Sequence, residues 1–204
     1  GKWIGGDVRG AEGVKRRCPY MRRELRVKKP VERALLYVSA RGVYELRLNG
    51  KKVGADYFSP GWTSYHNHIQ YQVFEVEEEL IKGKNALGVI LGDGWYRGFM
   101  GWQGKQDFYG EKLALFLRMD ISYQDGKKES IYSDEKWKSA TGPILSSDFQ
   151  MGEHYDARKE MPGWDMPGMN DNRWSGVKVS ATGIGTLVPP IGPPVVEIQT
   201  LKPV

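Results

Sequence analysis

The stretch "VERALLYVSARGVYELRLNGKKVG" (residues 31–54) carries the clearest fold signal in the sequence. Apolar side chains recur at every second position on both sides of Arg41-Gly42, namely at Leu36, Val38, Ala40, Tyr44, Leu46 and Leu48. A period of two is typical of half-buried β-strands, and Asn49-Gly50 favours a type I′ turn. The stretch therefore predicts a β-hairpin around Arg41-Gly42, followed by a tight turn at Asn49-Gly50.

Similar patterns flank this stretch on both sides. Residues 20–27 and 69–76 also alternate, and residues 112–134 predict a second hairpin closed by Asp125-Gly126. Between them, residues 77–91 predict a short turn of helix, a Gly-Lys-Asn turn and an apolar strand from Ala86 to Leu91. Strands at roughly ten-residue spacing with Gly- and Pro-rich turns predict an all-β fold, an antiparallel β-sandwich or jelly roll.

The composition argues against two classes of partner. The chain has 204 residues, 40% of them hydrophobic, and a net charge of +5. Outside one basic cluster in residues 15–29, the Lys and Arg residues stand singly among carboxylates, and no nucleic-acid-binding motif is present. No run approaches the 18 or so apolar residues of a membrane span. We therefore expect neither nucleic-acid binding nor membrane insertion.

Three parts of the chain differ in pattern. We expect residues 1–20 to be a leader or part of an adjacent domain, residues 21–178 to form the sandwich, and residues 179–204 to be a linker or the start of a further β domain. The chain begins without Met, so we interpret it as a piece of a longer protein. Cys18 is the single cysteine, which excludes an internal disulfide and favours a cytoplasmic protein, with an extracellular or periplasmic location as the alternative.

Candidates for catalysis are weak. Asp93 in "GDGWYRG" and Glu153 and Asp156 in "GEHYDAR" could form an acid/base pair, but each lies in a turn-rich segment where carboxylates commonly accept backbone hydrogen bonds. Neither a Ser/His/Asp order nor a phosphate-binding loop is present. We expect no active site in this stretch of chain.

A metal site is a second alternative. His66 and His68 are two residues apart and would share one face of a strand, and a third ligand would be His154 or a carboxylate. Oxygen donors suited to Ca²⁺ lie in predicted loops at Asn67, Asp93 and Asp107.

Aromatic residues carry more information. The chain has seven Trp and eleven Tyr, and many lie in predicted loops: Trp62, Trp95, Tyr96, Trp102, Phe108 and Tyr109. Trp137 and Trp174 fit the core instead. A loop Trp beside Asp, Asn and Gly can stack on the apolar face of a sugar while its short neighbours bond the hydroxyls. Loops on a rigid scaffold are where such function concentrates, so residues 92–110 predict either a sugar site or an ordinary packed loop.

Four segments in this order resemble the N-terminal accessory region of bacterial α-L-rhamnosidases, glycoside hydrolase family 78: "LYVSARGVYELRLNGKKVG", "PGWTSYHNHIQYQVFEV", "GKNALGVILGDGWYRG" and "GEHYDARKEMPGWDMPGMNDNRW". The resemblance implies a galactose-binding-like β-sandwich that is non-catalytic and precedes an (α/α)6 catalytic barrel of the same parent chain. The barrel of the family holds the inverting pair of acids. In some members a domain at this place is a calcium-dependent rhamnose-binding module, carbohydrate-binding module family 67.

The resemblance also implies site residues. Asn67 corresponds to a calcium and sugar ligand and Trp95 to a stacking ring, with Asp93 and Tyr96 beside it. The binding members have an acidic residue before that Asn, whereas this chain has His66, a poor ligand for Ca²⁺. Two functions follow, binding of rhamnose-containing glycans or a purely structural role against the barrel. In both we expect Trp62 to be buried under its turn, Asn67 to lie near the surface, and Arg158 to pair with Asp156 or Glu153.

Overall fold

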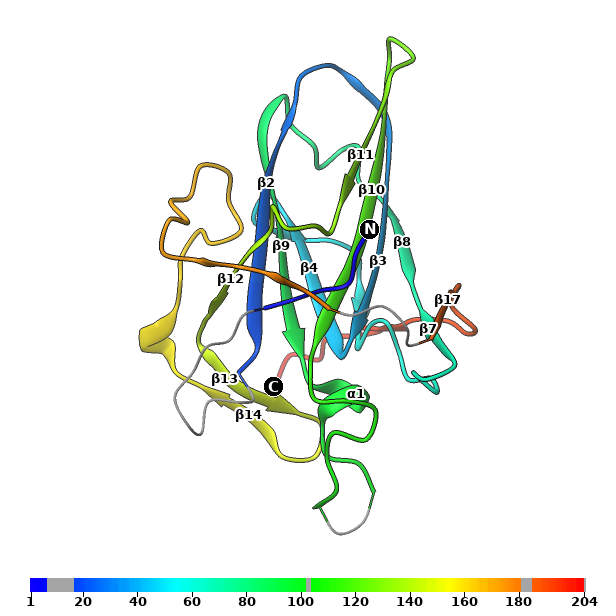
Figure 1. Cartoon of the computed structure of the whole chain (residues 1–204), viewed down its shortest axis with the longest axis vertical. Coiled ribbons are helices and arrows are strands. Elements are labelled where there is room, and N and C mark those ends of the chain that lie inside the picture. Colours follow the sequence, from blue (N-terminus) through cyan, green and yellow to red (C-terminus); the bar gives the residue numbers. More distant parts are fainter. Residues whose placement is uncertain (7–16, 102–103, 181–184, 204) are drawn as a thin grey trace.

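The computed structural model of the chain is an antiparallel β-sandwich, with two six-stranded sheets packed face to face (Figure 1). The structure describes residues 1–6, 17–101, 104–180 and 185–203. Within these ranges, no helix has the length and apolar character needed to cross a membrane. The two packed sheets confirm the predicted all-β sandwich.

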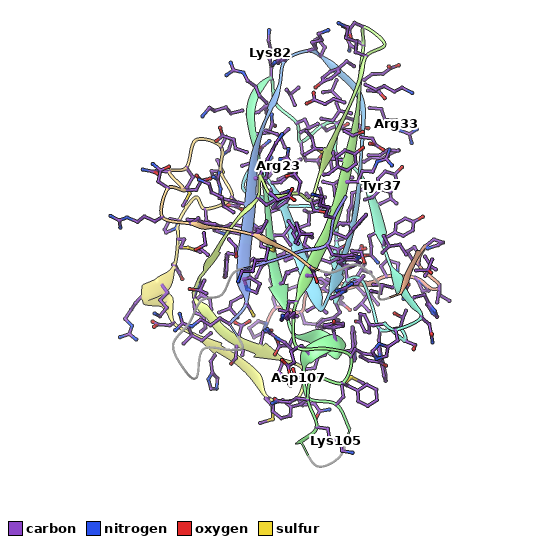
Figure 2. All side chains as sticks on the ribbon, viewed as in Figure 1. Arg23, Arg33, Tyr37, Lys82, Lys105 and Asp107 are labelled. Carbon is purple, nitrogen blue, oxygen red and sulfur yellow. The ribbon has the colours of Figure 1, made fainter. Side chains whose placement is uncertain are left out.

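The first sheet is built around β10 and β3, which pair along most of their length. Its strands in spatial order are β16 (Lys178–Val179), β1 (Ile4–Gly5), β10 (Ala114–Tyr123), β3 (Val31–Arg41) and β8 (Gln72–Glu75), with β11 (Lys128–Tyr132) also paired to β10. The β10–β11 hairpin pairs Ser122 with Lys128, as Asp125-Gly126 predicts. Arg33 and Tyr37 extend from the face of β3 opposite the buried Leu36 and Val38 (Figure 2).

The second sheet is built around β2 and β9. Its strands in spatial order are β15 (Ser175–Gly176), β12 (Lys138–Thr141), β2 (Pro19–Val27), β9 (Gly83–Gly92), β4 (Val43–Leu48) and β5 (Lys51–Lys52). Asn49 (φ 52°) and Gly50 (φ 82°) both adopt positive φ, and Leu48 pairs with Lys51 across them. The predicted type I′ turn is confirmed.

The predicted hairpin at Arg41-Gly42 is wrong, because β3 and β4 lie in different sheets. Gly42 (φ +117°) is the corner where the chain crosses from one sheet to the other. A Cβ at this position would lie 2.4 Å from the carbonyl oxygen of Gly92, so the corner requires glycine. Alternation identified both strands but holds no information about which strand pairs with which.

Two smaller predictions also fail. Residues 69–76 form two strands, β7 (His68–Gln70) and β8, interrupted at Tyr71, whose N–H donates to the Val188 carbonyl at 3.0 Å. Residues 77–79 form a turn rather than a helix, and β9 already begins at Gly83, where a turn was expected. Pairing with β2 extends the strand, since Gly83 lies opposite Val27.

The core lies between the two sheets and takes side chains from both. Leu36 and Leu117 of the first sheet and Leu46 and Val89 of the second are all buried in it. Trp137 is fully buried in this core and its indole N–H donates to the Tyr132 carbonyl at 3.0 Å, so that prediction is confirmed. Trp174 is buried as expected, at 9% exposed, but it stacks on Trp164 rather than joining the cluster between the sheets.

Both ends of the chain contribute to this architecture. Trp3 packs in the core and Ile4 of β1 pairs with β10, so residues 1–6 belong to the sandwich. At the other end, β17 (Thr186–Val188) runs parallel to β7, and β18 (Val195–Val196) pairs with β6 (Asp56–Tyr57). A separate hairpin is formed by β13 (Ile144–Asp148) and β14 (Gly152–Tyr155), followed by the short 3₁₀ helix η2 (Ala157–Lys159).

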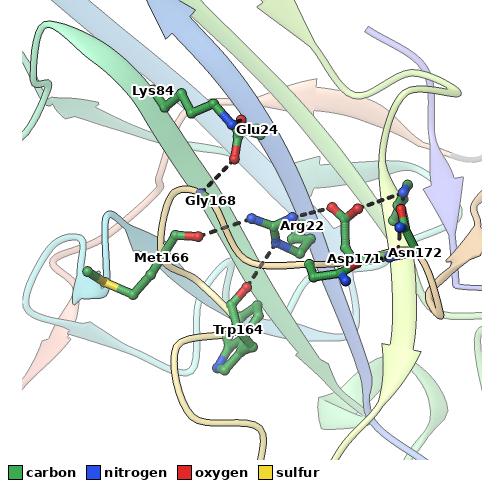
Figure 3. Close-up of polar contacts among 10 residues, drawn as sticks. Arg22, Glu24, Lys84, Trp164, Met166, Gly168, Asp171 and Asn172 are labelled. Carbon is green, nitrogen blue, oxygen red and sulfur yellow. Dashed lines mark hydrogen bonds and ion pairs between the residues drawn. The ribbon is translucent and has the colours of Figure 1, made fainter.

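The irregular loop of residues 161–174 is held against the second sheet by Arg22 (Figure 3). The guanidinium of Arg22 is 1% exposed, and it donates to the carbonyls of Trp164 (2.9 Å) and Met166 (3.1 Å) and forms an ion pair with Asp171. Glu24 also holds this loop on the sheet, because its carboxylate accepts the backbone N–H of Gly168 at 2.7 Å. A loop with little regular structure is thus fixed by charge-assisted hydrogen bonds.

Candidate functional site

Four aromatic side chains from two loops and the short helix α1 (Gly94–Arg97) gather at one end of the sandwich. We call this group the aromatic surface: Phe58 and Trp62 before β7, Trp95 on α1, and Phe149 in the β13–β14 turn. The rings of Trp62 and Trp95 are parallel to within 5°, with centroids 6.3 Å apart. The centre of the Phe149 ring lies 4.5 Å from that of Trp95 and 5.1 Å from that of Phe58.

The aromatic surface is open to solvent. Trp62 is 54% exposed, Phe58 47% and Phe149 43%, and Trp95 is half-buried between them. Aromatic rings usually bury most of their area, and a contiguous apolar patch on a protein surface commonly marks a binding site. The arrangement offers a cluster of exposed apolar rings to a ligand, with Trp62 the most exposed of the four.

Backbone geometry sets the positions of two of these rings. Gly94 (φ +52°) turns the chain out of β9 into α1, and a Cβ there would lie 2.6 Å from Cγ1 of Val43. Phe58 has φ +58°, which is rare for a bulky residue. Strained residues of this kind cluster at functional sites.

Trp62 is not buried under its turn, and that prediction is wrong. Tyr65, three residues later, is fully buried there, and its hydroxyl donates to the Gly61 carbonyl at 3.1 Å. Its ring packs against the rings of Tyr96 and Tyr109, with centroid distances of 5.3 Å and 4.9 Å. With that space filled, Trp62 points outward, and its indole N–H donates to the Tyr109 hydroxyl at 3.2 Å.

Asn67 lies at the surface, as expected. Its side-chain amide donates to the Ser64 hydroxyl at 3.1 Å, and its backbone carbonyl oxygen accepts the backbone N–H of Thr186 at 2.8 Å. His66 is exposed next to it, with its ring 5.5 Å from that of Tyr109. The turn that carries Trp62 therefore also carries Asn67.

Asp93 and Tyr96 lie behind the aromatic surface rather than on it, each 2% exposed. The Asp93 carboxylate accepts a hydrogen bond from Nε of Arg97 at 2.6 Å, four residues along α1. Burial raises the pKa of Tyr96, with an opposing effect from the charge of Arg41. These positions suit support of the loop that presents Trp95.

The residues around Asn67 do not fit a calcium cage, which needs several oxygen ligands with carboxylates among them. Its amide is bonded to a hydroxyl and its neighbour is His66 rather than an acid. In the part of the chain that the structure describes, no three His, Cys, Asp or Glu side chains are grouped so as to hold a metal ion. Asp107 lies in the loop beyond α1, close to Lys105 (Figure 2), with its N–H bonded to the Arg97 carbonyl at 3.1 Å.

Two members of the aromatic surface, Phe58 and Phe149, were not singled out from the sequence. Each is an aromatic residue in a connection between strands, and that was the available signal. Trp102 lies outside the described residues. Arg158 donates to Asp156 from Nε at 2.8 Å and from Nη2 at 3.0 Å, so the predicted pairing is confirmed.

A family profile described as "Alpha-L-rhamnosidase N-terminal domain" matches residues 29–199. An α-L-rhamnosidase of Streptomyces avermitilis is 45% identical over 159 residues, which are 78% of this chain and 15% of that protein. One from an Alteromonas species is 36% identical over 173 residues, 84% of this chain and 19% of that protein. The chain thus spans about a fifth or less of these curated relatives.

Solved structures agree. The crystal structure of the Streptomyces avermitilis α-L-rhamnosidase complexed with L-rhamnose matches 90% of this chain and 18% of that one, with a TM-score of 0.87 and 39% identity. The native Aspergillus terreus α-L-rhamnosidase matches 97% of this chain and 23% of that one, with a TM-score of 0.92 and 38% identity. A lectin of Pleurotus ostreatus shares the fold alone, with a TM-score of 0.56 and 19% identity.

Proposed function

Because this chain belongs to the family of α-L-rhamnosidase N-terminal domains, we propose that it is a non-catalytic domain that binds carbohydrate through its aromatic surface. The parent enzyme would hydrolyse terminal α-L-rhamnosyl residues of glycosides by inversion, with its acid pair in a separate (α/α)6 barrel. The domain would hold a rhamnose-containing glycan near that barrel.

The observation that carries this proposal is the parallel pair of Trp62 and Trp95 with Trp62 more than half exposed. A sugar can place its apolar C–H face on such rings, and burying that area from water favours binding. Asn67 on the neighbouring turn supplies an amide that can bond hydroxyls. Asp93 and Tyr96 serve the site indirectly, by fixing the loop of Trp95.

Calorimetric titration with L-rhamnose tests the proposal. Replacing Trp62 with Ala removes about 1–1.5 kcal/mol of stacking, so affinity should fall roughly tenfold. The matched control is Tyr132→Ala on β11, also an exposed ring, which should leave affinity unchanged. Equal affinities for all three proteins, or no heat from any of them, would remove the aromatic surface as a sugar site.

The same titration repeated with calcium and with EDTA tests the calcium prediction. Because the residues around Asn67 do not fit a calcium cage, we expect the same affinity in both. Binding that disappears with the chelator would restore calcium to the site.

A second function, packing against the parent's catalytic domain, is favoured by exposed apolar side chains in the last residues. Ile191 is 74% exposed, Ile198 95% and Leu201 77%. Side chains this apolar are more often covered than left in water. Ile198→Asp in the full-length parent should lower its melting temperature and leave that of the isolated chain unchanged; equal melting of both parents would argue against the contact.

A further inference from the structure

A cavity of about 210 Å³ lies directly beside the aromatic surface. It is lined by residues of β4, β5, β6, β9 and the β13–β14 hairpin, which belong to different sheets of the fold. Phe58 joins the two features, because it lines the cavity and its ring also contacts Trp95 and Phe149. A ligand lying on the aromatic surface would therefore have the cavity as its neighbour.

The size of the cavity suits one small ring. Drug-sized ligands occupy clefts of about 300–1,000 Å³, whereas a water molecule takes about 30 Å³. A space of about 210 Å³ lies between these values and matches a single monosaccharide unit better than an extended ligand.

The polar lining suits a neutral, hydroxyl-rich ligand. Three carboxylates, those of Glu45, Asp56 and Glu153, can accept hydroxyl protons, while Lys52 and Ser147 can donate to hydroxyl oxygens. Glu45 is paired with Nη1 of Arg47 at 2.9 Å, so the three carboxylates face two cations, Lys52 and Arg47, and the remaining negative charge disfavours an anionic ligand.

Two aromatic residues complete one wall. Nζ of Lys52 lies 3.9 Å from the centre of the Tyr57 ring, and Tyr57 is followed by Phe58 with its strained backbone (φ +58°). Phe58 lines the cavity while its ring also contacts Trp95 and Phe149. Functional sites are where such strain is commonly found.

We propose that this cavity is a second sugar subsite. It holds a neutral pyranose linked to the sugar that lies on the aromatic surface, and it rejects a uronic acid at the same position. This inference rests on the proposed function, because the first sugar fixes where the second one lies. The domain would then recognise a neutral rhamnosyl disaccharide rather than rhamnose alone.

Comparison of three ligands by calorimetry tests the inference: L-rhamnose, a neutral α-L-rhamnosyl-glucose, and the corresponding α-L-rhamnosyl-glucuronic acid. We expect the neutral disaccharide to bind at least about tenfold tighter than rhamnose (about 1.4 kcal/mol), and the acidic one to gain nothing. Equal affinity of rhamnose and the neutral disaccharide, or a gain for the acidic one, would overturn it.

A pair of variants locates the second sugar. Glu153 is exposed on β14 and lines the cavity, so Glu153→Ala should abolish the gain for the disaccharide while rhamnose binds as before. The matched control is Glu75→Ala on β8, another exposed carboxylate, which should keep the full gain. A gain that survives Glu153→Ala would place the second sugar elsewhere and overturn the inference.

The two proposals fail in different ways. If rhamnose and both disaccharides give no heat, the proposed sugar binding and the subsite fall together. If rhamnose binds and the neutral disaccharide binds no tighter, only the subsite falls. If the disaccharide alone binds and requires Glu153, the cavity is supported and the aromatic surface is not.

Discussion

Replacing Asp171 with Asn tests how the loop of residues 161–174 is held on the second sheet. The Asp171 carboxylate forms an ion pair with the buried Arg22 and accepts a hydrogen bond from Nζ of Lys138 at 2.6 Å. Asn keeps one oxygen acceptor but loses the negative charge that faces Arg22 and Lys138. The Arg22 side chain is 1% exposed.

The size of the loss in the free energy of unfolding depends on the hydrogen bonds that Arg22 keeps. Removing one partner of a buried ion pair costs about 3–5 kcal/mol. Here the guanidinium retains the Trp164 and Met166 carbonyls, at 2.9 and 3.1 Å, so we expect a smaller loss of about 2–3 kcal/mol in the free energy of unfolding. In a chain of this size each kcal/mol shifts the melting temperature by about 2–4 °C, so it should fall by about 4–12 °C.

The stability lost in Asp171→Asn should depend on pH, because it depends on the ionised Asp171 carboxylate. Burial acts to raise the pKa of Asp171, but the hydrogen bond from Lys138 and the charge of Arg22 outweigh burial and hold the pKa below its usual value. A carboxylate with a lowered folded-state pKa stabilises the protein above the unfolded value, about 3.9, and this contribution disappears as the pH falls through the folded value. The difference between wild type and Asp171→Asn should therefore be full at pH 7 and shrink below about pH 4.

Urea unfolding at pH 7 and at successively lower pH measures both effects. The matched control is Glu75→Gln, the same change of charge in the exposed pair with Arg33, where both side chains are at least 60% exposed. Exposed pairs contribute little, so this variant should unfold like wild type. A loss for Asp171→Asn under about 0.5 kcal/mol, or one that persists unchanged at low pH, would show that the Asp171 charge does not hold the loop on the sheet.

Three further predictions follow from burial and backbone geometry. Trp137→Ala should lower the free energy of unfolding by about 3–5 kcal/mol, because the ring is fully buried, and a loss under about 1 kcal/mol in urea would contradict this. Gly42→Ala should cost more than about 1 kcal/mol in the same assay, because φ is +117° and the new Cβ would meet the Gly92 carbonyl; unchanged stability would mean that the corner can relax. Burial raises the pKa of the Cys18 thiol to about 12, so the folded protein should not react with an aromatic disulfide reagent at pH 8 until denaturant is added, and rapid labelling of folded protein would show that the thiol is accessible.

The strands were largely predictable because each leaves a local pattern. Alternation marks β2 and β10, and the turn sequences Asn49-Gly50 and Asp125-Gly126 fix their own geometry. Which sheet a strand joins, and which strands it pairs with, leaves no such local pattern. The corner at Gly42 looked like a hairpin because a chain that crosses between sheets also shows alternating strands on both sides of a glycine.

The candidate site was predictable by composition but not by orientation. A loop rich in Trp, Asp and Gly pointed to Trp95, and the structure places that ring on the aromatic surface. Which aromatic residue fills the space under the preceding turn depends on packing, and Tyr65 rather than Trp62 occupies it. Asp93 carries the right chemistry for a ligand contact, yet its pairing with Arg97 could be seen only once α1 was placed.

If carbohydrate binds on the aromatic surface, the indole N–H signals of the tryptophans there should respond to it. The chain has seven tryptophans, so a ¹⁵N–¹H correlation spectrum recorded during titration with L-rhamnose reports on each ring separately. We predict saturable shifts of the Trp62 and Trp95 signals, while that of the buried Trp137 stays in place. Spectra in which no indole signal moves, or in which Trp62 and Trp95 stay fixed while others move, would show that the sugar does not bind on the aromatic surface.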